Sequence, residues 1–256
     1  MNKKLELLDF SKMKFDIIIA AGQSNCEGCG HGEVDAPFEP KDNIWYMNKN
    51  FTISTAKEKV VENSVVGAFK LIFADEYCKN GNLEPNRQLI IIDSPVGGTG
   101  FEKGMWGKNE PLTTNMLSMT KTVLNLNPEN KVVAFLWHQG ERSINFNLTP
   151  DFHMQSLRIL IDEVQSEFGN KFPLIAGDFV PLWKETKGEQ GILIEQAIRQ
   201  VFCNEYNGGF VESTGLTSNA ADVSYREDDI HFSRKSCYEL GKRYYKVFAQ
   251  QIANNR

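Results

Sequence analysis

The sequence lacks any apolar run of the length needed to cross a bilayer, so no membrane-spanning helix is expected. Its N-terminal stretch, Met1–Lys14, interrupts its apolar residues with Glu6, Asp9 and Lys12. It therefore has no continuous apolar segment of the kind found in a signal peptide. We expect a cytoplasmic protein with no membrane partner.

Cysteine is scarce and unevenly spaced. The chain has five cysteines, an odd number without the regular spacing of a disulfide framework, so a reducing compartment is expected. The nearest two, Cys26 and Cys29, have no second pair to complete a metal or redox motif, and both are predicted to be unpaired thiols. The remaining three are Cys78, Cys203 and Cys237.

A surplus of basic charge is also missing. The formal net charge is -5, and the charged residues are mixed along the chain without a basic stripe, so no nucleic-acid partner is expected. With 256 residues, 41% of them hydrophobic, the chain can bury one sizeable core, which favours a single domain over residues 1–256. No heptad pattern or apolar strip indicates an oligomeric state.

Short apolar runs alternate with longer segments of helical periodicity. This alternation predicts an α/β fold, a three-layer α/β/α sandwich around a five-stranded parallel sheet. The strands are expected at Phe15–Ala21, Gln88–Asp93, Lys131–Trp137, Phe172–Phe179 and Gly209–Glu212. The helices are expected at Ser64–Lys79, Pro111–Leu126, Thr149–Phe168, Glu189–Tyr206 and Ser233–Ala253, with Thr149 and Ser233 as caps. Residues 25–59 show no clear periodicity apart from a possible hairpin around Ile44–Ile53.

Ligands bind beyond the carboxyl ends of the strands in such sheets, so the segments that follow each strand carry the candidate site. Ser24 comes on a turn after the first strand, where Gly22 lets the backbone bend. A serine at this place is also a common helix cap, and the turn alone does not decide between the two roles. After the second strand, Gly97 and Gly98 expose backbone N–H groups that can approach a substrate oxygen.

Two further polar blocks complete the set. Gln139 and Glu141 follow the third strand directly, in a loop that either holds a buried hydrogen-bond network or takes part in function. Asp228 and His231 lie three residues apart just before the last helix. At that spacing a carboxylate can hold the imidazole Nδ1–H while Nε2 faces a hydroxyl group.

Three other classes of protein are less consistent with these blocks. An α/β-hydrolase requires Gly-x-Ser-x-Gly, and Cys26 stands where its last glycine belongs. A metallohydrolase would recruit His138, Glu141, Asp228 and His231, but no His-Glu-x-x-His helix is present, and we expect no metal and no cofactor. A non-catalytic carbohydrate-binding module remains open, although a binder has no need of an ordered serine, aspartate and histidine.

The four blocks together resemble the SGNH (GDSL-like) hydrolase superfamily, and within it the sialic-acid-specific acetylesterase-like branch that includes carbohydrate esterase family 6. The branch's Gly-Gln-Ser-Asn, Gly-Gly-Thr, Gln-Gly-Glu and Asp-x-x-His motifs match, in order, Gly22–Asn25, Gly97–Thr99, Gln139–Glu141 and Asp228–His231. The sequence departs from the branch at Gly100 and at Arg142-Ser143, outside the triad.

The resemblance implies a flavodoxin-like sheet and a serine esterase that removes a small acyl group, typically acetyl, from a carbohydrate through an acyl-enzyme. It makes Ser24 the nucleophile, His231 the base and Asp228 its partner. The oxyanion donors would be Ser24, Gly97 or Gly98, and Gln139. Supporting roles fall to Asn25 and to Glu141, which either holds the nucleophile loop or supplements Asp228. A short-chain esterase not specific for sugars remains an alternative.

Several other side chains are harder to assign. His31 and His153 are interpreted as surface residues, and His138 as packing or lining the site. Five aromatic residues could either stack on a sugar or pack in the core. They are Trp45, Tyr46, Phe101, Trp106 and Trp183.

Overall fold

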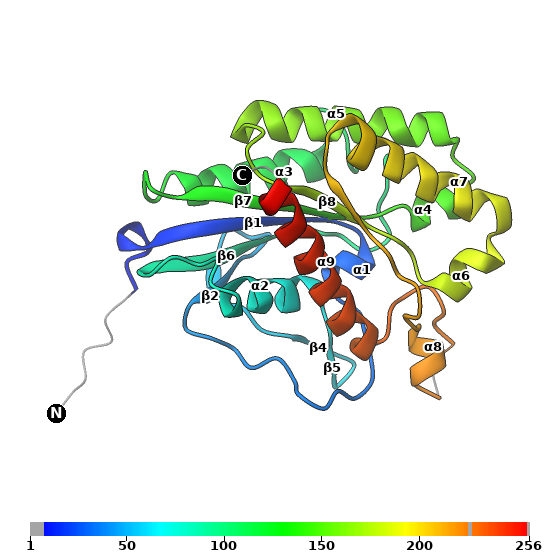
Figure 1. The fold of residues 1–256 in the computed structure, drawn as a ribbon, viewed down its shortest axis with the longest axis horizontal. Helices are drawn as coiled ribbons and strands as arrows, with labels where there is room; N and C mark the ends of the chain where they lie inside the picture. Colours follow the sequence, from blue (N-terminus) through cyan, green and yellow to red (C-terminus); the bar gives the residue numbers. More distant parts are fainter. Residues whose placement is uncertain (1–7, 225–226, 255–256) are drawn as a thin grey trace.

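The computed structural model describes residues 8–224 and 227–254. Residues 1–7, which formed half of the stretch judged not to be a signal peptide, lie outside the described residues. A seven-stranded sheet runs through the centre in the order β3-β2-β6-β1-β7-β8-β9, and all neighbouring strands are parallel except β2 and β3 (Figure 1). The strands are β1 Lys14–Gly22, β2 Ile44–Met47, β3 Ile53–Thr55, β6 Arg87–Asp93, β7 Lys131–His138, β8 Leu174–Gly177 and β9 Gly209–Val211.

The five predicted strands are β1, β6, β7, β8 and β9, and their order β6-β1-β7-β8-β9 is the flavodoxin-like order. The expected α/β/α sandwich is confirmed, but the count of five strands is wrong. The hairpin predicted around Ile44–Ile53 is the pair β2 and β3, and β2 extends the sheet by pairing with β6. Strands of four and three residues inside an irregular segment are too short to show a reliable sequence period.

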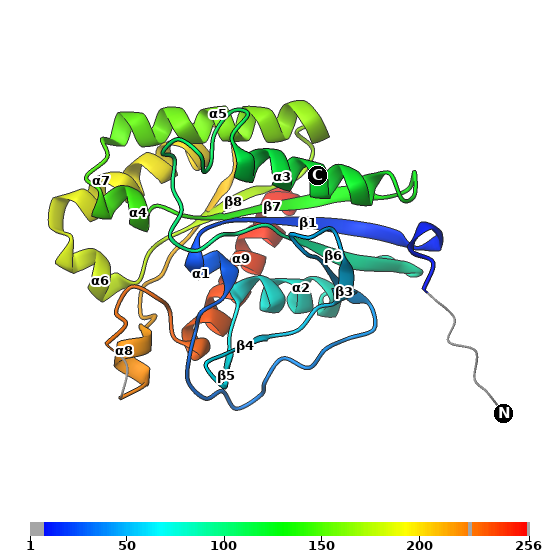
Figure 2. The ribbon, with the colours of Figure 1, turned by 180° about the vertical axis from the view of Figure 1, so that it is seen from behind.

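Helices cover both faces of the sheet (Figures 1 and 2). One layer contains α3 Pro111–Leu124, α5 Pro150–Phe168 and α7 Gly188–Arg199, and the opposite layer contains α2 Phe69–Lys79 and α9 Arg234–Asn254. Four short helices gather near the carboxyl ends of the strands: α1 Ser24–Glu27, α4 Glu141–Asn145, α6 Pro181–Thr186 and α8 Asn219–Asp222. The remaining elements are η1 Phe10–Lys12, the hairpin of β4 Lys59–Val61 and β5 Ser64–Val66, and the π-helical turn η2 Gln200–Glu205.

Two predicted helices begin or end differently in the structure. The helix expected from Ser64 starts only at Phe69, because the β-branched residues Val65 and Val66 belong to β5. Glu62 and Asn63 both have positive φ, as a two-residue hairpin turn of the mirror-image type requires. The helix expected over 189–206 is α7 followed by the wider turn η2.

The predicted helix caps are confirmed. The Thr149 hydroxyl accepts from Phe152 N at 3.2 Å, and the Ser233 hydroxyl accepts from Ser236 N at 3.2 Å. Within the described ranges, no helix is both long enough and apolar enough to cross a membrane.

Strand β1 lies at the centre of the sheet, and residues 17–21 are completely buried because helices cover both of its faces. Its neighbours β6 and β7 run parallel to it, with Ala20 opposite Asp93 and Gly22 opposite His138. The carboxyl ends of the three strands therefore meet, and the polar segments that follow them are brought to one edge of the sheet.

The interpretation of His153 and His31 as surface residues is wrong, because both are buried. His153 lies on the inward face of α5, where Nδ1 is 3.0 Å from the Ser143 hydroxyl and the ring packs edge-on against Phe101. His153 lies at a position of the helical period where an apolar residue would face the core. The prediction was wrong because it relied on the polarity of histidine and not on this position.

Two buried histidines predict acid lability. Burial lowers the pKa of His138 and of His153 from 6.5 to about 3. Below pH 6.5 the unfolded chain therefore protonates these two histidines, whereas the folded chain keeps them neutral. The folded state is thus fully stable with respect to these groups above pH 6.5, and the free energy of unfolding decreases as the pH falls toward 3. At pH 5 each histidine should lower the free energy of unfolding by about 2 kcal/mol.

Urea unfolding at pH 7 and pH 5 measures this loss, and His153→Gln serves as the matched variant. Between pH 7 and pH 5 it should lose about 2 kcal/mol less of its free energy of unfolding than the wild type loses. An unchanged pH dependence in the variant would show that His153 is not held neutral.

Candidate active site

The turn Gly22–Asn25, called the nucleophile turn below, packs tightly against β7. Gly22 has φ of +130°, and a Cβ atom there would lie 2.1 Å from the His138 carbonyl oxygen, so only glycine fits. The Gln23 N–H donates to that same carbonyl at 2.9 Å. Ser24 is the first residue of α1, where Gln23 rather than Ser24 occupies the cap position. The helix-cap explanation for Ser24 is therefore wrong.

The serine hydroxyl instead faces a histidine from the other end of the chain. Ser24 Oγ lies 2.8 Å from His231 Nε2, and His231 Nδ1 lies 2.9 Å from both carboxylate oxygens of Asp228. Burial opposes ionisation of Asp228, but hydrogen bonds from His231 and Asn219 hold the pKa of its carboxyl below the ordinary value. An ionised Asp228 keeps the proton of the imidazole on Nδ1 and leaves Nε2 free to accept the serine proton.

Asn219 was not predicted from the sequence. Its Nδ2 donates to Asp228 Oδ2 at 2.8 Å and to the Cys29 carbonyl at 3.0 Å, while its Oδ1 accepts from His31 N at 2.7 Å. This side chain joins the segment of the acid to the loop after α1. No motif marks it, because its role depends on contacts 190 residues apart in sequence.

Asn25 ties the nucleophile to the histidine. Its Oδ1 accepts from Phe232 N at 3.0 Å and its Nδ2 donates to the Ile230 carbonyl at 3.1 Å, so it holds both neighbours of His231. The same Nδ2 donates to Glu141 Oε1 at 2.6 Å. Glu141 therefore contacts Asn25, whereas Asp228 contacts His231.

The predicted oxyanion donors surround the same serine. A Cβ atom on Gly97 would lie 3.7 Å from Ser24 Cβ, which places this glycine beside the nucleophile. Its N–H, however, donates to Glu27 Oε2 at 2.9 Å. For Gly98, which has φ of +69° and is exposed, no hydrogen bond from the N–H is found in the part of the chain that the structure describes.

Gln139 is completely buried behind the turn. Its Nε2 lies 3.4 Å from Gln23 Oε1 and 3.5 Å from the Thr99 carbonyl oxygen. Both contacts are long for hydrogen bonds to an amide, so the donor keeps capacity for a stronger acceptor. A substrate oxygen can reach it only if the neighbouring loop or the side chain shifts.

A buried lysine anchors the nucleophile helix. Lys70 has no exposed surface, and its Nζ donates to the carbonyls of Cys26 and Glu27 at 2.6 and 2.7 Å, at the end of α1. It also pairs with Asp93 at 2.9 Å. Although burial opposes ionisation, Lys70 and Lys59 together hold the pKa of the Asp93 carboxyl below its ordinary value. A cation at the carbonyl end of α1 also suits the helix dipole.

Aromatic packing is decided by the structure. All five aromatic residues proposed as sugar platforms are buried, with Trp106 only 1% exposed, so they belong to the core. An exposed aromatic residue, Phe146, directly follows α4, and the Arg142 guanidinium lies 4.4 Å from its ring centre. Arg142 also donates to the Gly98 carbonyl at 2.8 Å and to Glu102 at 2.6 Å, so it braces the glycine turn.

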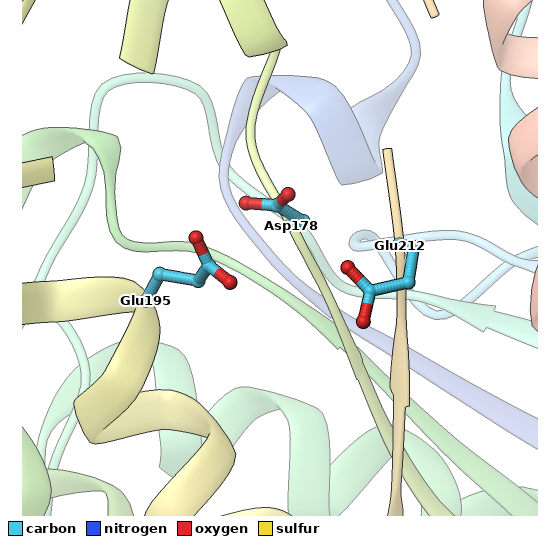
Figure 3. A group of neighbouring side chains, drawn as sticks. All are labelled: Asp178, Glu195 and Glu212. Atoms are coloured by element: carbon cyan, nitrogen blue, oxygen red, sulfur yellow. The ribbon is translucent and has the colours of Figure 1, made fainter. Parts of the chain in front are cut away.

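A separate carboxylate cluster lies at the same edge of the sheet. Figure 3 shows Asp178, Glu195 and Glu212 turned toward one another. In residues 8–224 and 227–254 this is the single group of three or more potential ligands that lie close enough together to hold a metal ion. Cations of the protein already occupy it. Lys184 Nζ lies 2.8 Å from both Asp178 oxygens and contacts Glu195, while Arg199 bonds Glu195 at 2.7 Å and Glu212 at 2.6 Å. The cluster is therefore an ion-pair network.

Unpaired thiols are found as predicted: all five cysteines are free. Burial raises the pKa of Cys26 to about 12 and that of Cys29 well above its ordinary value, so neither is a ready nucleophile.

The sheet places Ser24 after its first strand, and Asp228 and His231 precede its last helix. The same fold is found in a member of the lipolytic protein G-D-S-L family from Veillonella parvula, which is 11% identical at a TM-score of 0.50 and matches 92% of this chain and 99% of that one. The family model described as carbohydrate esterase, sialic acid-specific acetylesterase, matches residues 14–250. The chain belongs to that family.

Individual relatives are more distant. The chain is 27% identical over 127 residues to a probable 9-O-acetyl-N-acetylneuraminic acid deacetylase of Escherichia coli K12, and the match covers 39% of this chain and 38% of that protein. The solved structure of NanS shares 18% identity at a TM-score of 0.72, covering 95% of this chain and 98% of that one. A protein of Arabidopsis thaliana shares 16% identity at a TM-score of 0.72, covering 92% and 98%. At these identities the two structures establish the fold.

Proposed function

We propose that the protein is a serine esterase that removes an acetyl group from a carbohydrate ester through an acyl-enzyme. The observation that carries this proposal is the unbroken chain from Ser24 Oγ to His231 Nε2 at 2.8 Å and from His231 Nδ1 to Asp228 at 2.9 Å. This arrangement activates a hydroxyl group that is otherwise a weak nucleophile.

In the first half of the reaction, Ser24 Oγ attacks the acetyl carbonyl while His231 Nε2 takes its proton. The tetrahedral oxyanion collapses, the sugar oxygen leaves with the proton from His231, and Ser24 is acetylated. Water then attacks the acetyl-serine, again losing a proton to His231, and acetate departs as the serine recovers its proton. Asp228 stays ionised throughout and stabilises the imidazolium in both halves.

The oxyanion is assigned to the N–H groups of Ser24 and Gly98 and to Gln139 Nε2. Gly98 is preferred to Gly97 because the Gly97 N–H already donates to Glu27. Removing one donor of this kind costs on the order of 3 kcal/mol in the transition state, roughly a hundredfold in rate. Asn25 and Glu141 support the nucleophile turn.

The substrate proposed first is a sugar bearing an O-acetyl group, with O-acetylated sialic acid ahead of acetylated xylan. Membership of the sialic acid-specific acetylesterase family and the similarity to a probable 9-O-acetyl-N-acetylneuraminic acid deacetylase of Escherichia coli support this choice. We further propose that residues 1–256 form one hydrolase domain and that the protein works in the cytoplasm, where its free cysteines remain reduced.

Acetate release tests the proposal directly. The wild type, in the presence of a chelator, should release acetate from 9-O-acetylated sialic acid faster than from acetylated xylan. Faster release from xylan would retain the esterase and change its substrate. Release of no acetate from either, with tight binding of the sugar, would favour a carbohydrate-binding module instead.

A further inference from the structure

The Glu141 carboxyl group is buried without a counter-charge. It has no exposed surface, and the nearest basic atom that the described residues offer is His138 Nε2, 3.9 Å from Glu141 Oε1. Its oxygen Oε2 and the His138 Nε2 atom are both buried without a hydrogen-bond partner. A carboxylate without a counter-charge in such a place is costly, because burial removes its hydration, and only the Asn25 amide and the backbone N–H groups of Gly140 and Glu141 replace it.

The proton on His138 is fixed by a hydrogen-bond chain. The Tyr244 hydroxyl donates to the Trp137 carbonyl at 2.9 Å, so its oxygen is left to accept from His138 Nδ1, 3.0 Å away. The neutral tautomer therefore carries its proton on Nδ1, and Nε2 presents a lone pair toward Glu141. An ionised Glu141 would set a carboxylate against that lone pair, whereas a protonated Glu141 would not, although 3.9 Å is too long for a hydrogen bond between the two groups.

The groups around Glu141 supply little positive charge. Cys26, Cys29 and Tyr244 carry no positive charge in either protonation state, and burial raises the pKa of each. Burial raises the pKa of Glu141 itself, opposed by the Asn25 hydrogen bond, by the backbone N–H groups of Glu141 and Gly140, and by His231. Burial also lowers the pKa of His138 to about 3, which disfavours an ion pair between the two.

We propose that Glu141 is a neutral carboxylic acid that positions Asn25, so that Asp228 alone supplies negative charge to the catalytic imidazole. Through Asn25, the neutral acid fixes Ser24 on one side and both neighbours of His231 on the other. Glu141 is a positioning residue. The catalytic consequences of this inference rest on the proposed function, whereas the protonation state does not.

Glu141→Gln and Glu141→Ala form the matched pair of variants. The glutamine amide reproduces a neutral acid, because it carries no charge and its oxygen can still accept from Asn25. We expect Glu141→Gln to keep kcat for p-nitrophenyl acetate within about threefold, with an unchanged pH profile. We expect Glu141→Ala to lose about tenfold in kcat with little change in KM, because Asn25 loses its acceptor.

Loss of more than about tenfold in kcat for Glu141→Gln, with the acidic limb of the rate profile moved to lower pH, would overturn the proposal. That result would mean that an ionised Glu141 had been stabilising the imidazolium.

Infrared spectroscopy of the wild type in ²H₂O at pH 7 gives a readout that needs no hydrolysis. The proposal predicts the carbonyl band of a protonated carboxylic acid, and this band should disappear in both Glu141 variants. If Glu141→Gln does not fold, the wild type and Glu141→Ala still decide the point. Absence of the band overturns the proposal, and its presence in a protein without esterase activity would uphold the neutral acid while contradicting the proposed function.

Discussion

Ser24→Ala is expected to abolish esterase activity, with kcat for p-nitrophenyl acetate falling by about 10³- to 10⁶-fold. Alanine removes the oxygen that attacks the carbonyl, and no other hydroxyl in the described chain contacts His231 Nε2. Residual turnover would come from the oxyanion donors and from substrate positioning alone. The rates are compared with a chelator present in both reactions.

The matched control is Ser156→Ala on the exposed side of α5, where the serine hydroxyl only bonds the Phe152 carbonyl. This variant should keep the wild-type rate. Circular dichroism and thermal unfolding should show both variants folded. Wild-type turnover by a folded Ser24→Ala protein would eliminate Ser24 as the nucleophile.

Asp228→Asn is expected to lower kcat by about 10⁴-fold while leaving the fold intact. Asp228 accepts from three donors, the backbone N–H of His231, the imidazole Nδ1 of His231 and Asn219 Nδ2. An asparagine has one oxygen and one NH₂ group, so it can accept from Asn219 only by turning its own donor toward the imidazole. His231 must then carry its proton on Nε2, where it cannot take the proton of Ser24.

Asp229→Asn provides the control, because it removes the same charge from a neighbouring carboxylate that is exposed. Its kcat should stay within about twofold of the wild type, since an exposed charge is largely screened by solvent. Equal losses in the two variants would show that general electrostatics, rather than the tautomer of His231, accounts for the effect. Steady-state kinetics at pH 8, with both variants checked for folding, make the comparison.

The sheet could be predicted because its central strands are buried on both faces. A strand such as β1 is apolar at every position from Ile17 to Ala21, and no surface helix has that pattern. The candidate site followed from the same logic, because parallel strands bring their carboxyl ends to one edge. The contacts of Ser24, His231 and Asp228 with one another agree with that expectation.

Other features depend on contacts that the sequence does not show. The hairpin of β2 and β3 was expected, but only the pairing of β2 with β6 makes it part of the main sheet, and Asn219 is recognisable only through its contact with Asp228. The hydrogen bond from the Gly97 N–H to Glu27 joins a loop to the end of α1, 70 residues away in the sequence. His153 was misplaced because burial of a histidine depends on tertiary packing rather than on its own polarity.

The fold explains why one short turn can connect so many parts of the site. Lys70 donates to a carbonyl at the end of α1, while Asn25 and the Ser24 hydroxyl contact the loop before α9. Gly22 lets the turn lie directly on β7, beside Gln139. The nucleophile is thus fixed before substrate binds, which is how a preorganised site lowers the barrier to reaction.

Covalent labelling of the folded wild type with a fluorophosphonate tests the central claim most directly, because it requires an activated serine but not the correct sugar. Mass spectrometry should find one phosphonyl group per chain, on the peptide that contains Ser24, with activity lost in proportion to labelling. Ser24→Ala should take up no label. Labelling at another serine with loss of activity, or an unlabelled Ser24 in an active enzyme, would contradict the assignment of Ser24, His231 and Asp228 as the catalytic triad.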